Sequence, residues 1–221
     1  MKLSKAELAR FIETVILKPD GTRPEVIKLC EDAVKYNFVT VCVHPCYVTL
    51  AKSILKGTTV GLMTAVGFPF GANTTATKVF ETQDAIKNGT DEVDMMMFMG
   101  AFKDKLFDAV RDDINAVVKA ADGRIIKVIL ETALLSREEK IKACQIAVEA
   151  SAHFVKTSTG NVFPGATVDD IKLMRQTVGP HFGVKASGGI TKLSEVLAFI
   201  EAGATRVASR VAVDIVDSLT E

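Results

Sequence analysis

The chain has 221 residues, of which 48% are hydrophobic and 24% are charged, as in an ordinary soluble globular protein. Its 27 basic and 27 acidic side chains balance, so the charge predicts no nucleic-acid partner and no binding to anionic membranes. No apolar run reaches the length of a membrane span, and the N-terminal run MKLSKAELARF predicts the start of an amphipathic helix rather than a signal peptide.

Short β-rich runs alternate with longer runs of helical periodicity along the whole chain. We expect strands at residues 12–17, 39–43, 60–66, 91–97, 125–131, 153–157, 182–186 and 205–209. We expect helices at residues 23–36, 46–56, 74–88, 104–121, 137–150, 168–178 and 192–202. Several of these helices end near a glycine, at positions 57, 89, 123, 179 and 203. Thr167 and Asp170 have the spacing of a capping box, with Asp in place of Glu.

This alternation predicts one domain, residues 1–221, with the (β/α)₈ fold of a TIM barrel in the α/β class. Most strands lack a clean alternation of polar and apolar residues, which is typical of parallel strands covered on both faces. The competing fold is an open doubly wound sheet, which would carry a glycine-rich fingerprint after its first strand. The sequence at that place is ILKPDGTRPE, so we expect the barrel.

In a TIM barrel the chemistry lies at the C-terminal ends of the strands. The polar residues at such positions are Glu13, Cys42, Asp94, Lys127, Glu131, Lys156, Lys185, Ser209 and Arg210. Three of them are lysines on successive strands, and a lysine inside an apolar strand is costly unless it is neutral or paired. Burial and a neighbouring positive charge both lower the pKa of a lysine and favour the neutral amine. Such an amine can attack a carbonyl and form an imine without a metal or cofactor.

The alternative is that these lysines only form ion pairs with Asp94, Glu131 or Glu13. Lys156 and Lys185 are followed by small residues and glycine, in FVKTSTG and GVKASGG. These residues favour a barrel that processes carbonyl compounds, and they leave the ion-pair alternative open.

Long motifs follow one another along essentially the whole chain. They are LKPD at 17–20, VCV-x-P at 41–45, GFPFGANTT at 67–75, EVDMMMFMGAFK at 92–103, KVILET at 127–132, FVKTSTG at 154–160, GATVDDIKLM at 165–174, FGVKASGGI at 182–190 and EAGATR at 201–206. In this order and spacing the chain resembles the 2-deoxyribose-5-phosphate aldolase family.

The resemblance implies a class I aldolase, a carbon–carbon lyase that reversibly cleaves 2-deoxyribose 5-phosphate to glyceraldehyde 3-phosphate and acetaldehyde. It implies that Lys156 carries the Schiff base, that Lys185 depresses the pKa of Lys156, and that Asp94 transfers protons. The further substrate-site residues that we expect are Glu13, Cys42, Lys127, Thr159, Gly160, Gly188, Gly189, Ser209 and Arg210. Of these, the glycines would bind the phosphate through backbone N–H groups. The resemblance also implies a homodimer, with small aldehydes as substrates and no cofactor.

The chain departs from the family pattern at the expected pocket. Val15 stands at a polar position, Phe98 at an Asn, and Asn161 at a Phe or a basic residue. After the eighth strand, the family's glycine and hydroxyl residues are replaced by Ala208–Ser209–Arg210–Val211. Either Arg210 binds the anion in place of the serines, or the anion site is closed and Arg210 points to solvent.

Two alternative functions remain at this point. The same lysine imine could serve a repurposed or engineered barrel that acts on non-phosphorylated aldehydes or adds nucleophiles to enals. The second alternative is a non-catalytic barrel that only binds sugar phosphates. Such a barrel would be expected to lack Lys156, Lys185 or Asp94.

The four cysteines have neither zinc spacing nor the density of a disulfide scaffold, so they predict a reducing, cytoplasmic compartment. Cys42 either faces the pocket or is a buried, inert thiol. Cys42 and Cys46 flank His44, but no further ligand cluster lies nearby, so we expect no metal site.

Overall fold

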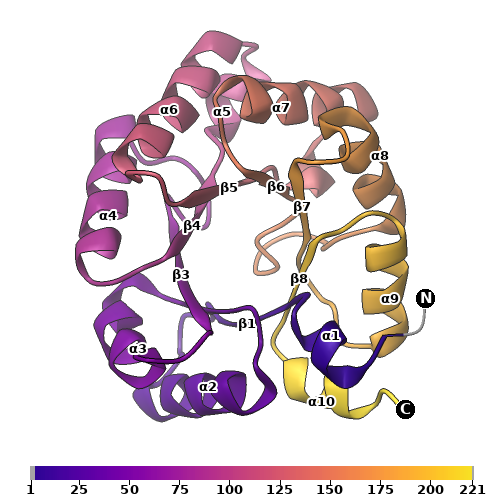
Figure 1. The fold of residues 1–221 in the computed structure, drawn as a ribbon. Coiled ribbons are helices and arrows are strands. Elements are labelled where there is room, and N and C mark those ends of the chain that lie inside the picture. Colours follow the sequence, from indigo (N-terminus) through magenta and orange to yellow (C-terminus); the bar gives the residue numbers. More distant parts are fainter. Residues whose placement is uncertain (1–2, 221) are drawn as a thin grey trace.

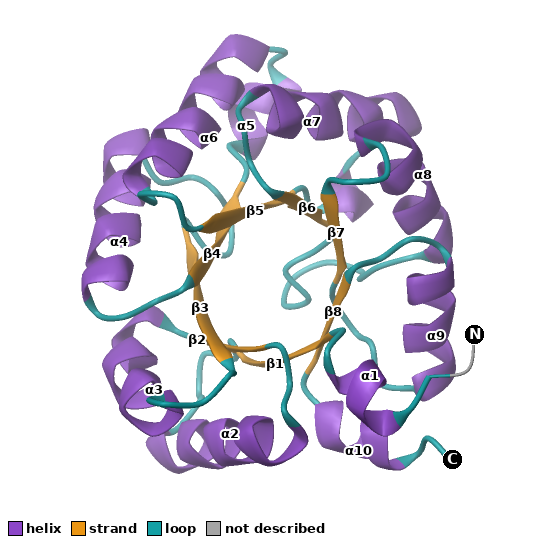
Figure 2. Cartoon of the chain, in the orientation of Figure 1, coloured by secondary structure: helices purple, strands orange, loops and turns teal. Residues whose placement is uncertain are grey.

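Eight parallel strands close into a barrel in a computed structural model that describes residues 3–220. Each strand pairs with its neighbour in the sequence, and β1 pairs with β8 to close the ring. Helices surround the ring on the outside (Figures 1 and 2). The predicted (β/α)₈ TIM barrel is therefore confirmed.

The strands are found where the sequence places them, each shortened by one or two residues. They are β1 (Ile12–Ile16), β2 (Thr40–Val43), β3 (Gly61–Val66), β4 (Glu92–Met96), β5 (Ile125–Ile129), β6 (Phe154–Lys156), β7 (Gly183–Ala186) and β8 (Arg206–Ser209). Their residues are almost all buried, because the barrel interior covers one face and the helices cover the other.

The helices also follow the prediction, with three differences. They are α1 (Lys5–Ala9), α2 (Arg23–Tyr36), α3 (Val48–Leu55), α4 (Thr75–Lys87), α5 (Met99–Lys103), α6 (Phe107–Ala120), α7 (Arg137–Glu149), α8 (Val168–Val178), α9 (Leu193–Glu201) and α10 (Ala212–Asp217). The helix expected at 104–121 begins only at Phe107, after a turn in which Lys105 has φ 61°. The helix expected at 46–56 starts as a 3₁₀ turn, Pro45–Tyr47. Neither α5 nor α10 was predicted.

The expected capping box at the start of α8 forms only in part. The Thr167 hydroxyl accepts a hydrogen bond from the Asp170 N–H at 3.1 Å. The Asp170 carboxylate instead pairs with Lys140 of α7 at 2.6 Å, because Asp is one carbon shorter than the Glu of a capping box and a neighbouring cation is available.

The end of β5 differs from the sequence prediction in a way that affects the site. The strand stops at Ile129, and Glu131 adopts the left-handed conformation with φ 50° and ψ 64°. A non-glycine residue adopts this conformation at a cost, so other contacts must hold it there.

A buried ion pair supports the C-terminal end of β4 from outside the barrel. Lys78 of α4 pairs with Asp113 of α6 at 2.7 Å, and both side chains are at most 1% exposed. The same ammonium donates to the carbonyl of Met96 at 3.1 Å. Met96 ends β4, so this contact fixes the strand that carries Asp94.

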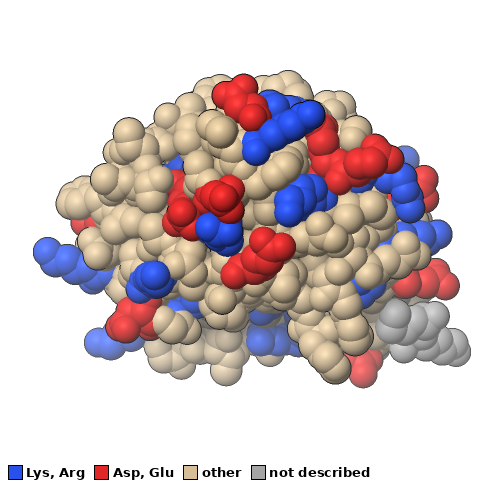
Figure 3. All heavy atoms as spheres, turned by 90° about the horizontal axis from the view of Figure 1, so that it is seen from above, with Lys and Arg blue, Asp and Glu red and all other residues tan. Residues whose placement is uncertain are grey.

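Charges of both signs are interspersed on the face that Figure 3 shows, in keeping with the balanced composition. Within residues 3–220, none of the helices combines the length and apolar character needed to cross a membrane.

Candidate active site

The strand register brings the predicted lysines and Asp94 together inside the barrel. Lys156 of β6 and Lys185 of β7 are direct Cα partners, so their side chains start at the same depth. Lys127 of β5 pairs with Phe154 and with Asp94, and therefore lies one inward-facing layer deeper than Lys156.

Asp94 joins the two upper lysines. Its Oδ2 accepts a hydrogen bond from Lys156 Nζ at 2.8 Å and from Lys185 Nζ at 2.7 Å. All three side chains are buried, with Lys156 2% exposed and the other two fully buried. A single carboxylate oxygen therefore bridges the two amines.

Four further residues complete the charge cluster below, namely Glu13, Glu92, Lys127 and Arg206. Glu13 of β1 forms an ion pair with Lys185, and its second oxygen lies 3.9 Å from Lys127. Lys127 pairs with Glu92 at 2.5 Å and with Asp94 at 3.4 Å. We refer to Glu13, Asp94, Lys127, Lys156 and Lys185 as the floor of the site.

The charges of this cluster balance if Lys156 is neutral. Three carboxylates, those of Glu13, Glu92 and Asp94, face three other cations, those of Lys127, Lys185 and Arg206. An unbalanced charge in a buried site is costly, so a fourth ammonium is disfavoured.

The pKa shifts agree with this balance. Burial lowers the pKa of Lys156, and the charge of Lys185 acts in the same direction against the opposing effect of Asp94. Burial also acts to lower the pKa of Lys185, but Asp94 and Glu13 outweigh it and raise that pKa above its ordinary value. Burial would raise the pKa of Asp94, yet Lys156 and Lys185 hold it well below its usual range.

A cavity of about 170 Å³ opens above the floor at the C-terminal ends of the strands. Of the expected site residues, those that line it are Cys42, Lys156, Thr159, Gly160, Lys185, Gly188, Gly189, Ser209 and Arg210. The cavity is not lined by Asp94, Glu13 or Lys127. These side chains lie beneath it, where they contact other side chains of the floor.

One wall of the cavity is apolar, formed by Val15, Leu17, Cys42 and Met63. Cys42 therefore both faces the cavity and is buried, at 1% exposure. Burial, with Asp94 nearby, raises the pKa of its thiol to about 12, so the thiolate is scarce at neutral pH.

The opposite wall is built from glycine loops. Gly160, Gly188 and Gly189 have φ of 74°, 100° and 70°. A Cβ at Gly160 would lie 2.8 Å from the Cα of Gly188, so this close approach of two backbones requires glycine. The N–H groups of Gly188 and Gly189 donate to no acceptor within residues 3–220. Such adjacent backbone donors form a nest suited to an anion.

The loop after β8 contributes one charged side chain to the rim. The Ser209 hydroxyl is engaged within the protein, donating to the carbonyl of Ile190 and accepting from the N–H of Val211. Arg210 is exposed but lines the cavity, and its Nη2 donates to Gly160 O at 3.0 Å and to Asn161 Oδ1 at 2.6 Å.

Glu131 has a contact that the sequence does not reveal. Its Oε2 accepts hydrogen bonds from the Thr159 N–H at 3.2 Å and the Thr159 hydroxyl at 2.7 Å. The position of Glu131 at the end of a strand marked it in the sequence as a possible site residue. That position did not predict the left-handed backbone that turns its carboxylate toward Thr159. Phe98, a departure from the family pattern, does not line the cavity and lies beside Lys78.

Across residues 3–220, no three His, Cys, Asp or Glu side chains gather into a group that could hold a metal ion.

Comparison with known proteins identifies the family of the chain. Residues 13–214 match the model of the DeoC/LacD family aldolases. The chain is 54% identical over 215 residues to a deoxyribose-phosphate aldolase of Enterococcus faecalis, covering 97% of this chain and 98% of the relative. It is 51% identical to one from a Geobacillus species, covering 96% of each chain.

A solved structure gives the same result. The tetrameric deoxyribose phosphate aldolase of Aeropyrum pernix superposes with a TM-score of 0.91 at 29% identity, covering 97% of this chain and 92% of the other. The alternative of a barrel repurposed for conjugate addition or non-phosphorylated aldehydes has no support in these relatives, and neither has a non-catalytic barrel. The chain therefore belongs to the DeoC/LacD aldolase family, and it is a class I aldolase, a carbon–carbon lyase.

Proposed function

We propose that this aldolase cleaves 2-deoxyribose 5-phosphate reversibly to glyceraldehyde 3-phosphate and acetaldehyde, through an imine on Lys156. The observation that carries the proposal is the carboxylate of Asp94, which bridges a lysine with a lowered pKa and a lysine with a raised pKa beneath the cavity. The names of the relatives support the substrate.

The two lysines have different tasks in this proposal. The neutral amine of Lys156 attacks the C1 carbonyl of the sugar to give a carbinolamine, which loses water to form the imine. The protonated Lys185 keeps Asp94 ionised and supplies positive charge near the departing hydroxyl. Asp94, in hydrogen-bond contact with both amines, transfers the protons between them.

Bond cleavage follows from the imine. The C3 hydroxyl gives its proton to Asp94, directly or through a water, as the C2–C3 bond breaks. The protonated imine accepts the electron pair of that bond, which leaves an enamine on Lys156 and releases glyceraldehyde 3-phosphate. Protonation of the enamine and hydrolysis then release acetaldehyde and restore the amine. The apolar wall with Val15 and Cys42 accommodates the two-carbon fragment.

The rim binds the phosphate in this proposal. The free N–H groups of Gly188 and Gly189, together with the Gly160 loop, provide backbone donors. Arg210 adds a cation at the same rim. Thr159 and Ser209 border the site, and Glu13 and Lys127 support the charges of the floor.

The proposal includes a homodimer that acts in the cytoplasm. The relative from Aeropyrum pernix is a tetramer, so self-association occurs in the family. Four free cysteines, three of them buried, suit a reducing compartment. Light scattering of the purified protein tests the dimer.

The test of the substrate is a coupled assay that measures cleavage of 2-deoxyribose 5-phosphate beside cleavage of unphosphorylated 2-deoxyribose. We expect a much higher kcat/KM for the phosphorylated sugar, with the difference mainly in KM. Equal or lower kcat/KM for the phosphorylated sugar would overturn the proposed substrate.

A further inference from the structure

A series of hydrogen bonds joins three loops across the rim of the cavity. Arg210, after β8, donates to the Gly160 carbonyl and to the Asn161 side chain in the loop after β6. Asn161 Nδ2 in turn donates to the carbonyl of Leu17, after β1, at 2.8 Å. We call Leu17, Gly160, Asn161 and Arg210 the rim clasp.

The rim clasp lies where the substrate cavity meets a groove along α2. This groove has a volume of about 480 Å³, against about 170 Å³ for the cavity. Its lining beyond the shared residues is Ile16, Lys18, Pro24, Glu25, Lys28, Leu29 and Asp32. The cavity and this groove share only Val15, Leu17 and Arg210, so two of the three shared residues belong to the clasp.

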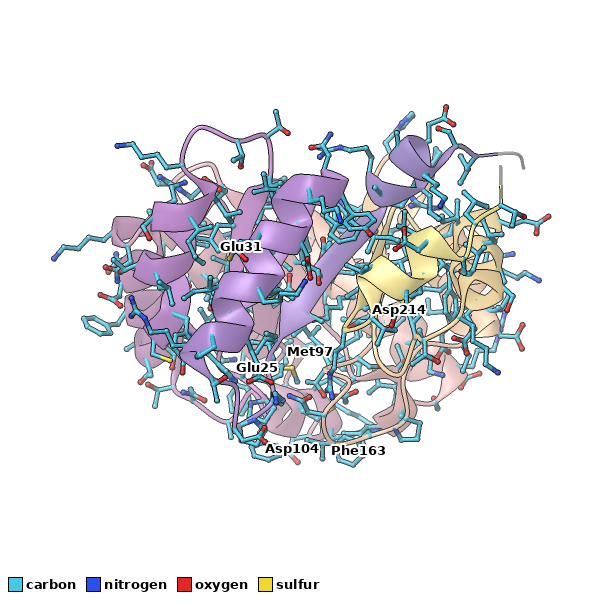
Figure 4. The ribbon with its side chains drawn as sticks, turned by 90° about the horizontal axis from the view of Figure 1, so that it is seen from below. Glu25, Glu31, Met97, Asp104, Phe163 and Asp214 are labelled. Carbon is cyan, nitrogen blue, oxygen red and sulfur yellow. The ribbon has the colours of Figure 1, made fainter. Side chains whose placement is uncertain are left out.

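A second groove also adjoins the clasp, at Leu17 and Asn161. It is lined by Pro19, His44, Pro45, Ala65, Phe68, Pro69 and Glu81, and has a volume of about 460 Å³. The residues that it shares with the cavity are Leu17 and Asn161, which are hydrogen-bonded to each other. Figure 4 shows Glu25, of the first groove, and Phe163, in the loop that carries Asn161, at the same edge of the barrel.

We propose that Arg210, positioned by Asn161, determines the length and charge of the acceptor aldehyde by closing the cavity toward these grooves. This inference rests on the proposed function, because it assigns the end of the same substrate site. Arg210 uses only Nη2 in the clasp, and its other guanidinium N–H groups donate to no acceptor among residues 3–220. They are therefore free to bind an anionic group at the end of an acceptor.

The clasp is a barrier that can open. The two hydrogen bonds that Arg210 donates in the clasp lie at the exposed rim, where water replaces a lost partner at little cost. Removal of either side chain would join the cavity to a larger and partly apolar groove. Longer uncharged acceptors would then fit, while a short phosphorylated acceptor would lose a charged contact.

The experiment compares Arg210→Ala, Arg210→Lys and Asn161→Ala with the wild type. Arg124→Ala is the matched control, since it removes the same charge from the segment before β5, at the opposite end of the barrel. Each protein is assayed for aldol addition of acetaldehyde to propanal and hexanal, and for cleavage of 2-deoxyribose 5-phosphate. Imine formation is measured separately by borohydride reduction with acetaldehyde.

In Arg210→Ala, we expect the ratio of kcat/KM for hexanal to that for propanal to rise about tenfold. We also expect KM for 2-deoxyribose 5-phosphate to rise about tenfold with kcat little changed. Asn161→Ala should raise the hexanal ratio with a smaller effect on KM for the phosphorylated sugar. Arg210→Lys should keep the preference for phosphate but also raise the hexanal ratio. Arg124→Ala should match the wild type.

A hexanal ratio within twofold of the wild type in both Arg210→Ala and Asn161→Ala, with normal imine formation, would overturn the inference. If the wild type forms the imine but does not cleave 2-deoxyribose 5-phosphate, the proposed substrate fails while the aldehyde ratios still decide the role of the clasp. Absence of an imine on Lys156 in the wild type would overturn both.

Discussion

The floor and the rim of this site differ in the chemical groups that form them and in the burial of those groups. The floor consists of ionisable side chains that are buried on strands and paired with one another at short distances. The rim consists of glycine backbone and of side chains such as Asn161 and Arg210, whose hydrogen bond to each other is exposed. Electrostatic interactions are strong in the buried floor and weak at the hydrated rim.

The difference separates the two tasks of the enzyme. The floor fixes protonation states, so changes there should act on kcat and on imine formation. In the proposed function the rim contacts the far end of the substrate, so changes there should act on KM and on the choice of acceptor. Variants of the floor and of the rim test this division.

Lys156→Ala should abolish cleavage and aldol addition, because no other described side chain offers a neutral amine to the cavity. Lys156→Arg keeps most of the volume but has no nucleophilic amine and adds a buried positive charge, and it should be equally inactive. Steady-state assays with circular dichroism as a control for folding test both variants. Substantial turnover in either would remove Lys156 from the mechanism.

Asp94→Asn should lower kcat by ~10²–10⁴ through the loss of an acid–base group. The amide keeps the shape of the side chain but cannot carry the proton between the two lysines. Rapid-mixing measurement of imine formation would detect the change, and KM for the phosphorylated sugar should stay close to that of the wild type. A rise in KM alone would contradict the assignment of Asp94 to the floor.

Lys185→Met should move the acidic limb of the pH profile of imine formation to higher pH. The charge of Lys185 lowers the pKa of Lys156. Its removal lets Lys156 keep its proton up to a higher pH, so the neutral, reactive amine appears later as pH rises. The rate of acetaldehyde trapping as a function of pH tests this shift. An acidic limb at the same pH as in the wild type, or at a lower pH, would show that Lys185 does not depress the pKa of Lys156.

Glu131→Ala should raise KM for 2-deoxyribose 5-phosphate by about tenfold, since it removes hydrogen bonds to a charged group that hold Thr159 beside Gly160. Glu131→Gln retains an acceptor oxygen and should restore most of the affinity. Acetaldehyde trapping on Lys156 should be unchanged in both variants. Slower trapping with normal KM would place Glu131 with the floor instead of the rim.

The same division explains how much could be predicted from the sequence. The barrel followed from periodicity, because eight strand–helix units leave few other folds. The lysines of the floor were recognisable because charged residues inside apolar strands are rare and strand pairing brings successive strands together. Regular secondary structure was therefore enough to predict that the lysines of the floor lie together, although not the distances between their side chains.

The rim was less predictable, because irregular loops and long side chains have no fixed period. The sequence marked Asn161 and Arg210 as separate departures from the family pattern, but did not indicate that they bind each other. It also left two positions for Arg210 open, and the structure places this side chain at the rim of the cavity. The left-handed turn at Glu131 had no signal, since glycine or asparagine would be expected there.

The most direct test of the account is to incubate the wild-type protein with acetaldehyde and borohydride and to map the reduced adduct by mass spectrometry. We expect a single ethyl group on Lys156, because it is the floor lysine whose pKa is lowered and whose side chain lines the cavity. Lys127 and Lys185 should remain unmodified. An adduct on Lys185 instead of Lys156, or no adduct in the floor at all, would contradict the assignment of the nucleophile.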